Sequence, residues 1–369
     1  MLPRALVTNM QFNDRMRIGF SIAQTGALSV MGMQAVNGVR LWVSQVERKG
    51  GIRIGQQLLP VRLIIRDDGS RTSIAHKNFE SLINEDHADV LLGPYSSHLT
   101  KAAAEICHAY RRILWNHGGA SDEICRGDSH WLVSTLSPAS QYLQKLPPWI
   151  ATNDGQADHY LVLSSSKGTF ASHVAAGLRQ SIGALAKPVR LRAAELPESI
   201  DALIRLLNEM TPAVLILIGT FDQETGFIQT RRAWPKSIRQ VACVSAGVDQ
   251  FVGSVGELAE GIVGPSQWEP GVHHAISTGP QSHQFVSDFT YSFRESPNYV
   301  AAGAFATGLI IEECVRRAAS LDDADLRNTA RNLKTHTFYG QFRIDQSGRQ
   351  IGHAMHLVRW QDGRKIVLT

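Results

Sequence analysis

Cysteine is scarce in this sequence. The 369 residues contain four cysteines, Cys107, Cys125, Cys243 and Cys314, and none of them forms a C-x-x-C pair. This scarcity excludes a disulfide scaffold. If the protein is exported, Cys107 and Cys125 are able to form a bridge, and two unrelated buried thiols fit the sequence equally well.

Long hydrophobic runs are absent too. No stretch approaches the roughly 18 apolar residues that span a bilayer, and the start, MLPRALVTNMQFNDR, lacks the apolar core of a signal peptide. We therefore expect no direct membrane insertion. As written, the sequence carries no address, so either the protein is cytoplasmic or an export signal is missing from this version.

The sequence also lacks an excess of one charge. Its formal net charge is +4, its Lys and Arg residues are scattered, and no basic block is interleaved with aromatic residues. Nucleic acid is therefore not an expected partner. The composition, 43% hydrophobic and 19% charged, is that of an ordinary globular protein long enough for two cored domains.

Common enzyme motifs are missing. There is no phosphate loop, no G-x-G-x-x-G, no H-E-x-x-H and no G-x-S-x-G elbow. Residues 127–130 (GDSH) superficially resemble the start of a hydrolase motif, but no strand leads into them and a solvated turn explains them better. The remaining enzymatic hypothesis pairs His117 with Ser97 or Ser121 as base and nucleophile. We favour a protein that is not an enzyme.

Metal and acid–base sites have little support. His273 and His274 are adjacent and would diverge, and His353 and His356 fall on opposite faces of a predicted strand. The pair at 67–68 (DD) is better explained by a turn and helix cap than by an acid and a base. We therefore expect no catalytic residue, no metal and no cofactor.

Short apolar strands alternate with amphipathic helices along the first part of the chain. Strands are predicted over residues 16–22, 60–68, 88–93 and 113–115. The helices between them are predicted over about 33–49, 72–86 and 99–110.

The alternation then restarts. Strands are predicted over 159–165, 189–194, 213–219, 241–246 and 261–264, with helices near 171–182, 200–210, 281–294, 299–319 and 325–333 and antiparallel strands at the end. Uninterrupted apolar strands such as AVLILIG indicate burial on both faces, as in a parallel sheet covered by helices. Two runs of β-α units predict an α/β protein with two doubly wound parallel-sheet lobes.

Loops that follow strands are the candidate site, because open α/β sheets hold ligands at the carboxyl ends of their strands. Three loops stand out in the first lobe: 24–32 (QTGALSVMG), 93–98 (GPYSSH) and 115–121 (WNHGGAS). Ser97 is predicted near a helix N-terminus, where N–H groups favour an anion or a carbonyl oxygen, and a plain serine N-cap explains it as well. Gly118 would let a ligand approach the backbone, although a simple turn also accounts for it.

These loops, in this order, resemble those of the type I periplasmic solute-binding proteins of branched-chain amino acid (leucine/isoleucine/valine-binding) ABC transporters, whose fold amide-sensing cytoplasmic regulators share. The resemblance runs from about residue 17 to 368. Its main carriers are IGFSIAQTGALSVMG, the helix ending in ERKGGI, LIIRDDGSRTSIA, VLLGPYSSHLTKAAAE, SPASQY, AEGIVGPSQWEP and YGQFRIDQSGRQIG. Seven segments in the expected order imply the type I periplasmic binding protein fold.

The resemblance implies two lobes joined by a hinge of three chain crossings that lets the lobes close on a ligand. Carried over, residues 16–136 plus 267–337 form the first lobe and residues 137–266 plus 338–369 the second. Residues 1–15 are then an N-terminal extension.

The resemblance also implies ligand contacts in the first lobe. Ser97 matches a serine that hydrogen-bonds a ligand carboxylate, and Gly118 matches a position whose backbone does likewise. Met31 and Tyr95 fall where residues of the side-chain pocket sit, although Met31 is equally well explained as core filler.

From the second lobe, Phe170 matches an aromatic that completes the site, and Phe221 is matched to another. Trp268 beside a crossing is as readily a structural plug as a ligand contact. The candidate ligand-binding residues are Met31, Tyr95, Ser96, Ser97, Asn116, His117, Gly118, Gly119, Ala120, Phe170, Phe221 and Trp268.

Two departures from the family pattern concern the ligand. Ala120 stands where the family usually has a hydroxyl residue, with Ser121 next to it as a substitute. An acid that would pair with an α-ammonium is missing from residues 244–246, which leaves Asp249 as the nearest candidate. Because an unpaired buried ammonium costs several kcal/mol, we expect a small carboxylate or amide, aromatic ones included, rather than leucine.

We therefore expect a solute-binding protein of an ABC-type uptake system that captures a small amino-acid-like, carboxylate or amide ligand by hinge closure. Its partner is a membrane permease if the protein is exported, and the resemblance implies a periplasmic or extracytoplasmic location. The main alternative is a cytoplasmic ligand-responsive regulator of the same fold, which the missing signal peptide favours.

Overall fold

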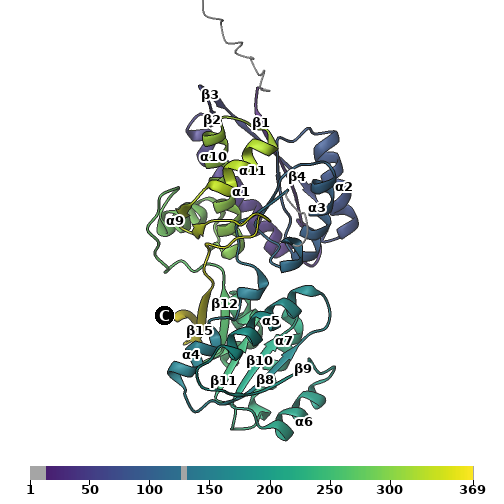
Figure 1. The fold of residues 1–369 in the computed structure, drawn as a ribbon, viewed down its shortest axis with the longest axis vertical. Coiled ribbons are helices and arrows are strands. Elements are labelled where there is room, and N and C mark those ends of the chain that lie inside the picture. The colour runs from purple at the N-terminus through teal and green to yellow at the C-terminus, as the bar shows by residue number, and fades with distance from the viewer. Residues whose placement is uncertain (1–13, 126–130, 369) are drawn as a thin grey trace, which may run out of the picture.

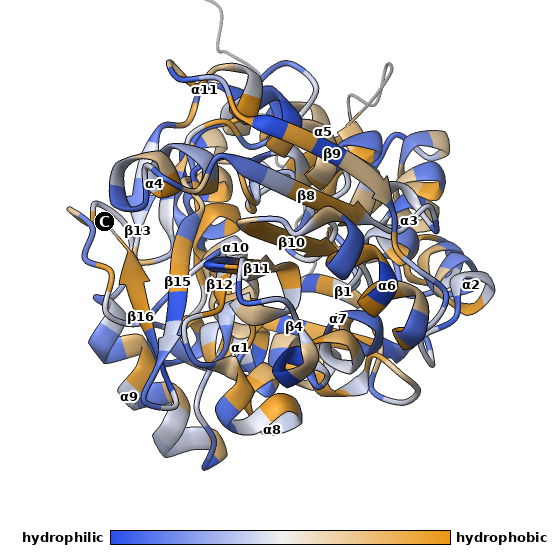
Figure 2. Cartoon of the chain, turned by 90° about the horizontal axis from the view of Figure 1, so that it is seen from below, coloured by the Kyte–Doolittle hydropathy of each residue, from blue (hydrophilic) through white to orange (hydrophobic). Residues whose placement is uncertain are grey.

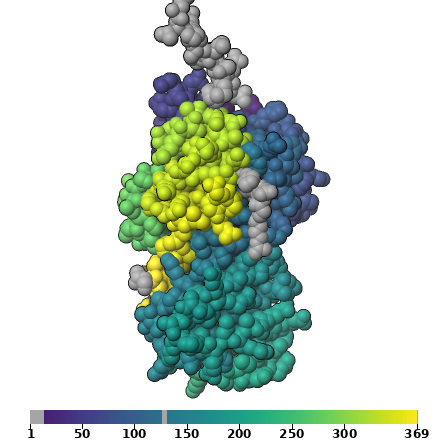
Figure 3. Space-filling model, viewed as in Figure 1, coloured from purple at the N-terminus to yellow at the C-terminus, as the bar shows by residue number. Residues whose placement is uncertain are grey.

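The molecule consists of two α/β lobes, one above the other in Figure 1. This computed structural model describes residues 14–125 and 131–368. Most of the expected N-terminal extension (1–15) and the turn at 127–130 lie outside the described residues. Segments from both ends of the chain build the upper lobe, and the middle of the chain builds most of the lower one (Figure 3).

The first lobe contains a five-stranded parallel sheet in the order β4-β1-β5-β6-β7. Its strands are β1 (Met16–Ile22), β4 (Val61–Asp67), β5 (Val90–Leu92), β6 (Leu114–Asn116) and β7 (Leu132–Ser134). Its helices are α1 (Ser29–Arg48), α2 (Thr72–Asn84), α3 (Ser97–Ala109), α9 (Ser282–Phe293), α10 (Tyr299–Ala318) and α11 (Asp323–Asn332). Short hairpins add β2 (Ile52–Ile54) with β3 (Gln57–Leu59), and β13 (Thr335–Thr337) with β14 (Gly340–Phe342).

The second lobe contains a seven-stranded sheet in the order β16-β15-β12-β11-β10-β8-β9. Its parallel strands are β8 (His159–Ser164), β9 (Arg190–Glu195), β10 (Val214–Ile218), β11 (Gln240–Cys243) and β12 (Val263–Ser266). Strand β15 (His356–Gln361) pairs antiparallel with β12, and β16 (Arg364–Leu368) pairs antiparallel with β15. Its helices are α4 (Leu146–Asn153), α5 (Thr169–Gly183), α6 (Ile200–Met210), α7 (Phe221–Ile228) and α8 (Gln250–Val255). All five residues of β10 are buried, and the strand is apolar along its length (Figure 2).

Both sheets follow the same strand order. In each lobe the second strand along the sequence lies beside the first, on the side opposite the third (β4-β1-β5 and β9-β8-β10). The strand order therefore reverses between β1 and β5 and between β8 and β10, where open α/β sheets form their ligand crevices. This topology confirms the expected fold class of two doubly wound parallel-sheet lobes.

Three chain crossings connect the lobes and are hydrogen-bonded to one another. Gln267 on the second crossing accepts from the Ser137 N–H of the first at 3.0 Å and donates to the Ser137 carbonyl at 2.9 Å. His353 on the third crossing lies 2.8 Å from Ser137 Oγ through its Nδ1. These three residues are buried, so the crossings form one connected unit.

The third crossing comes later in the chain than expected. Phe338, Phe342 and Ile344 pack in the core of the first lobe, and Phe338 stacks on Phe285 with ring centroids 4.5 Å apart. Their buried apolar side chains keep residues 338–344 with the first lobe, although the sequence placed 338 onwards in the second. The remaining lobe limits stay a prediction.

The structure bears on membrane, metal and disulfide expectations within the described part of the chain. There, no helix is long and apolar enough to cross a bilayer, and no three potential ligands among His, Cys, Asp and Glu gather as a metal site would require. All four cysteines are buried and free. The bridge between Cys107 and Cys125 is therefore not formed in this structure.

Gly308 allows α1 and α10 to pack closely. A Cβ added to it would lie 2.2 Å from Trp42 Cδ2, and Trp42 is fully buried. We expect Gly308→Ala to lower the free energy of unfolding by about 1–3 kcal/mol through overpacking. Gly253→Ala in α8 is the control, because a Cβ there meets nothing within 4 Å and should add about 0.5–1 kcal/mol. Urea unfolding measures both, and equal changes would contradict the packing argument.

Candidate functional site

A cavity of about 390 Å³ lies between the two lobes. The first lobe contributes residues of α3 and of the loop after β6, and the second contributes the loops after β8 and β10. All of these segments follow the carboxyl ends of parallel strands. The cavity therefore lies where the topology of both sheets places a ligand.

Ser97 connects two loops at the floor of this cavity. Its Oγ accepts hydrogen bonds from the N–H groups of Ala120 at 3.2 Å and Ser121 at 3.0 Å. Because the hydroxyl oxygen already accepts twice, its remaining polar function is to donate its own hydrogen. Ser97 lines the cavity, so this donor is available to a ligand oxygen.

Asn116 shapes the glycine turn and is not free to bind a ligand. Its Oδ1 accepts from the N–H groups of Gly118 at 3.1 Å and Gly119 at 2.8 Å, and its Nδ2 donates to Ser134 Oγ at 3.0 Å. A Cβ added to Gly118 would lie 2.5 Å from the Pro94 carbonyl oxygen. Close packing of two loops therefore accounts for the turn. The side chain of Asn116 is occupied by these bonds, so the structure does not support the prediction that it contacts a ligand.

His117 is also removed from the ligand contacts. Its side chain is 1% exposed and lies edge-on to Phe20 with ring centroids 5.6 Å apart. Burial lowers its pKa to about 4, so the ring is neutral at pH 7. His117 directly follows β6, and successive side chains of a strand point to opposite faces of the sheet. Its side chain therefore points into the first lobe and not into the cavity.

Trp268 is a structural residue. Its side chain is 2% exposed and packs edge-on against Phe285 and Phe338, with ring centroids 5.7 and 6.0 Å away. The sequence allowed either a structural role beside the crossing or a contact with the ligand. The structure supports the structural role, since the Trp268 side chain is buried in the first lobe.

Met31 and Tyr95 lie near each other at the start of α10. Asn298 Nδ2 lies 3.3 Å from Met31 Sδ, and the hydroxyl groups of Tyr95 and Tyr299 are 3.1 Å apart. Sequence reasoning missed Asn298 and Tyr299 as site neighbours, although Asn298 before a helical stretch is an N-cap signal. None of these four residues lines the described cavity.

Phe170 lines the cavity from the second lobe. Its ring lies edge-on to Tyr142 with centroids 5.2 Å apart, and Tyr142 Oη accepts from Gln267 Nε2 at 3.2 Å. Phe170 is thus connected through Tyr142 to the crossings. Phe221 begins α7 and is half-buried, but only its predecessor Thr220 reaches the cavity wall.

Hydroxyl groups bridge the two lobes across the cavity. Ser121 Oγ in the first lobe lies 2.9 Å from Thr169 Oγ1 and 3.2 Å from His173 Nδ1 in the second. Ser121 therefore faces the opposite lobe, and its role as a substitute for the hydroxyl missing at Ala120 stays a prediction. The side chain of Ala120 instead packs in the core of the second lobe.

Two helix N-termini give the cavity a positive potential. Helix α3 begins at Ser97 after Ser96, whose Oγ lies 2.8 Å from His98 Nδ1 and makes no capping bond. Helix α5 begins at Thr169 after Gly168, again without a side-chain cap. Uncapped first-turn N–H groups carry partial positive charge. In contrast, a capping box satisfies the start of α7.

Lysines add to this potential. Lys101 and Lys167 both line the cavity, and Lys101 Nζ is 2.8 Å from Glu123 Oε1. Burial lowers the pKa of His98, so His98 is mostly neutral at pH 7. With one lysine neutralised by Glu123, the charged residues of the cavity wall sum to one positive charge.

Glu224 is an acidic residue near the site in the second lobe, and sequence reasoning missed it. It is fully buried, and its two carboxylate oxygens accept from the N–H groups of Gly219 at 2.7 Å and Ser245 at 2.6 Å. Burial raises its pKa to about 7. Glu224 fixes the loops after β10 and β11 from beneath, but does not line the cavity. Asp249, the acid that the sequence suggested, instead pairs with Lys365 at 2.8 Å.

The acidic pair after β4 has a structural role. Asp67 Oδ1 accepts from the N–H groups of Gln24 and Gly69, both at 2.9 Å, and Asp68 Oδ1 accepts from the Ser70 N–H at 2.9 Å. These bonds form a turn and fasten the loop after β1. They agree with the turn that the sequence favoured over an acid–base pair.

Two doubly wound lobes, three linked crossings and a cavity between the lobes define the class of hinged, two-lobed binding proteins. The sequence profile of the family described as "Periplasmic binding protein" matches residues 15–365, and the chain therefore belongs to this family. Its membership confirms the expectation of a binding protein that is not an enzyme.

Solved structures show how widely the fold is shared. The chain is similar to a leucine-binding protein from Thermotoga maritima, with a TM-score of 0.80, 16% identity, and coverage of 96% of this chain and 98% of the other. It is also similar to a solute-binding protein of an ABC transporter from Rhodopseudomonas palustris in complex with 3,4-dihydroxybenzoic acid (TM-score 0.79, 18% identity, 96% and 97% covered). A substrate-binding protein from Desulfitobacterium hafniense in complex with Leu gives a TM-score of 0.80 at 17% identity, with 96% and 100% covered.

Proposed function

We propose that this protein is the solute-binding component of an ABC-type uptake system and captures a small carboxylate or amide without an α-ammonium group. Its location would be extracytoplasmic, and a membrane permease would recognise the closed form. The similar structures described above support this class of function, since they include binding proteins for leucine and for an aromatic acid. The identity of the ligand that this chain binds is part of the proposal.

The convergence of hydrogen-bond donors on one cavity carries the proposal. Ser97 offers its hydroxyl hydrogen from the first lobe, and the uncapped N-termini of α3 and α5 approach from opposite lobes. Lys167, which also lines the cavity, has no ion pair among the described residues. Such a set of donors matches a carboxylate or an amide oxygen, because helix N-termini and hydroxyl donors both favour negative charge.

The absence of a free acid argues against an α-amino acid. Among the described residues, the only carboxylate that lines the cavity is Glu123, which pairs with Lys101. Glu224 is buried behind the loops and already accepts two backbone hydrogen bonds. An α-ammonium would therefore lose its hydration without gaining a counter-charge, which costs several kcal/mol.

Capture in this proposal proceeds by reversible closure. The first lobe holds the oxygen atoms of the ligand through Ser97, and the second lobe adds Phe170 and the start of α5. The contacts of Ser121 with Thr169 and His173 support this proposal, because they join the two lobes beside the cavity. The ligand stabilises the closed form by its additional contacts with the second lobe.

A thermal-shift panel tests the proposal. Benzoate, benzamide, leucine and leucinamide are added to the intact protein, and a ligand at about 100 times its Kd should contribute about 2.7 kcal/mol of stability. We expect benzoate or benzamide to raise the Tm and leucine to have a much smaller effect. Comparable shifts for leucine and benzoate would refute the discrimination against zwitterions. If none of these ligands, and no other acid or amide in a wider panel, raises the Tm, the proposed function is wrong.

A further inference from the structure

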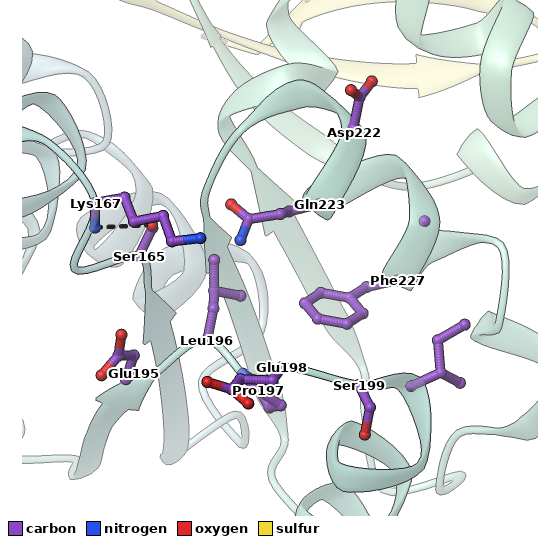
Figure 4. A pocket seen from close by; sticks show the side chains of 12 residues that line it. Ser165, Lys167, Glu195, Leu196, Pro197, Glu198, Ser199, Asp222, Gln223 and Phe227 are labelled. Atoms are coloured by element: carbon purple, nitrogen blue, oxygen red, sulfur yellow. Dashed lines mark hydrogen bonds between the residues drawn. The ribbon is translucent and has the colours of Figure 1, made fainter.

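A second cavity, of about 450 Å³, lies in the second lobe beside the interlobe cavity. The two cavities share Ser165 and Lys167 on their walls. The remaining wall comes from the segment after β9, the start of α6 and one side of α7 (Figure 4). The two cavities therefore adjoin at Ser165 and Lys167.

One side of this second cavity is apolar. Leu196 and Phe227 present the edge of the second-lobe core, and Ile200 at the start of α6 is 48% exposed. The uncharged polar neighbours are occupied, since Ser199 Oγ caps α6 and Gln223 Oε1 accepts from the Thr220 N–H at 3.0 Å. The wall therefore offers hydrophobic contact for the methylene or aryl part of a ligand.

The charged groups of the second cavity are mostly acidic. Glu195, Glu198 and Asp222 stand against a single ammonium, that of Lys167. Glu195 accepts from Ser166 Oγ, whereas no ion pair within the described ranges involves Glu198, Asp222 or Lys167. Three carboxylates and one ammonium leave two negative charges, which favour a cationic group at this end of a ligand.

We propose that the second cavity is a tail compartment for an elongated carboxylate with an apolar middle and a distal amine or guanidinium group. Its carboxylate lies at Ser97, its middle passes Lys167 onto Leu196 and Phe227, and its cationic end reaches Glu198. Asp222 adds to the negative potential of the same wall. This inference rests on the proposed function for the carboxylate end. It adds a ligand length and a distal charge that a small acid such as benzoate does not have.

A substitution at Gly226 would block the tail compartment and leave the interlobe cavity open. It lines the second cavity within α7, and an added Cβ there meets nothing within 4 Å. Gly226→Leu therefore adds an apolar side chain to the cavity wall, and its Cβ meets no neighbouring atom. Gly253→Leu is the matched control, because Gly253 is also a helical glycine with open space at its Cβ and lines neither cavity.

Calorimetric titration of four probes tests the inference: butanoate, 4-aminobutanoate, octanoate and 8-aminooctanoate. We expect 8-aminooctanoate to bind at least about tenfold more tightly than 4-aminobutanoate and than octanoate. Gly226→Leu should weaken 8-aminooctanoate by about tenfold and leave butanoate unchanged, while Gly253→Leu affects neither. Glu198→Gln combined with Asp222→Asn should remove the preference for 8-aminooctanoate over octanoate, with thermal unfolding confirming that each variant is folded.

The outcomes separate the two proposals. If butanoate or benzoate binds but 8-aminooctanoate gains nothing over the shorter probes, the tail compartment is refuted and the proposed function stands. The tail compartment is likewise refuted if Gly226→Leu and Gly253→Leu behave alike. If no carboxylate binds the unaltered protein, both the proposed function and the tail compartment are wrong.

Discussion

Ser97→Ala is expected to weaken the binding of benzoate by about 10- to 100-fold. The variant removes the only donor of the Ser97 side chain, and hydrogen bonds to charged groups contribute about 1.5–3 kcal/mol. It also leaves the N–H groups of Ala120 and Ser121 without the acceptor they have now. The loop that we propose to hold the carboxylate would therefore lose both a ligand contact and an internal hydrogen-bond partner. Calorimetric titration gives the change in Kd.

A serine away from the cavity is the control for this experiment. Ser254 lies exposed in α8, where its Oγ donates only to the Gln250 carbonyl at 3.4 Å. Ser254→Ala should leave the Kd for benzoate unchanged. Urea unfolding of Ser97→Ala should show a loss of about 1–2 kcal/mol from the unpaired N–H groups. Equal Kd values for the two variants would show that Ser97 does not bind the carboxylate.

Acid is expected to remove the stability that neutral His353 provides. Its Nδ1 lies 2.8 Å from Ser137 Oγ, its Nε2 lies 3.0 Å from the Tyr339 carbonyl oxygen, and burial lowers its pKa to about 3. The contribution is complete above the unfolded pKa of about 6.5 and is lost as the pH falls towards 3. Between about pH 6.5 and 4.5 the loss is about 3 kcal/mol.

Glu224 is expected to act in the opposite direction. Its folded pKa of about 7 exceeds the value of 4.5 for an ordinary glutamate. Its contribution is therefore complete below about pH 4.5 and is lost as the pH rises towards 7. Over this range the change is about 3 kcal/mol. The two groups oppose each other, so the unaltered protein should show a flatter pH profile than either group would give alone.

Variants separate these two opposing contributions. The free energy of urea unfolding is measured from pH 4.5 to 7 for the unaltered protein, His353→Asn and Glu224→Gln. His353→Asn should lose less stability on acidification than the unaltered protein, and Glu224→Gln should lose more. Both variants lower stability at every pH, so the test is the slope and not the absolute value. Three parallel curves would contradict the assignment.

Local sequence signals determined most of the regular elements. The run AVLILIG became β10, which is buried on both faces, and its lack of alternation alone predicts a central parallel strand. Helix α6 spans Ile200–Met210 as predicted, because Ser199 caps its start and apolar residues recur with helical spacing. Such signals act within one element, so a single sequence contains them.

Elements with weak local signals escaped prediction. Strand β7 is only three residues long and is recognised by its pairing with β6. Helix α4 contains a proline pair at its start, which reads as a break although proline is tolerated in a first turn. Helix α7 has a capping box at Thr220 that sequence reasoning overlooked. Tertiary packing decides whether such short segments become regular.

The sequence by itself determined the two-lobed α/β class and the loops that follow the strands. It also predicted that Ser97 lies near a helix N-terminus in one of these loops. Only the tertiary structure decided that Ser97 bonds to the loop at 120–121, that His117 and Trp268 belong to the first lobe's interior, and that Glu224 supports the cavity from behind. The physical reason is the range of the interactions. Periodicity and capping act over a few residues, whereas the burial and hydrogen-bond partners of a loop side chain depend on segments far away in the chain.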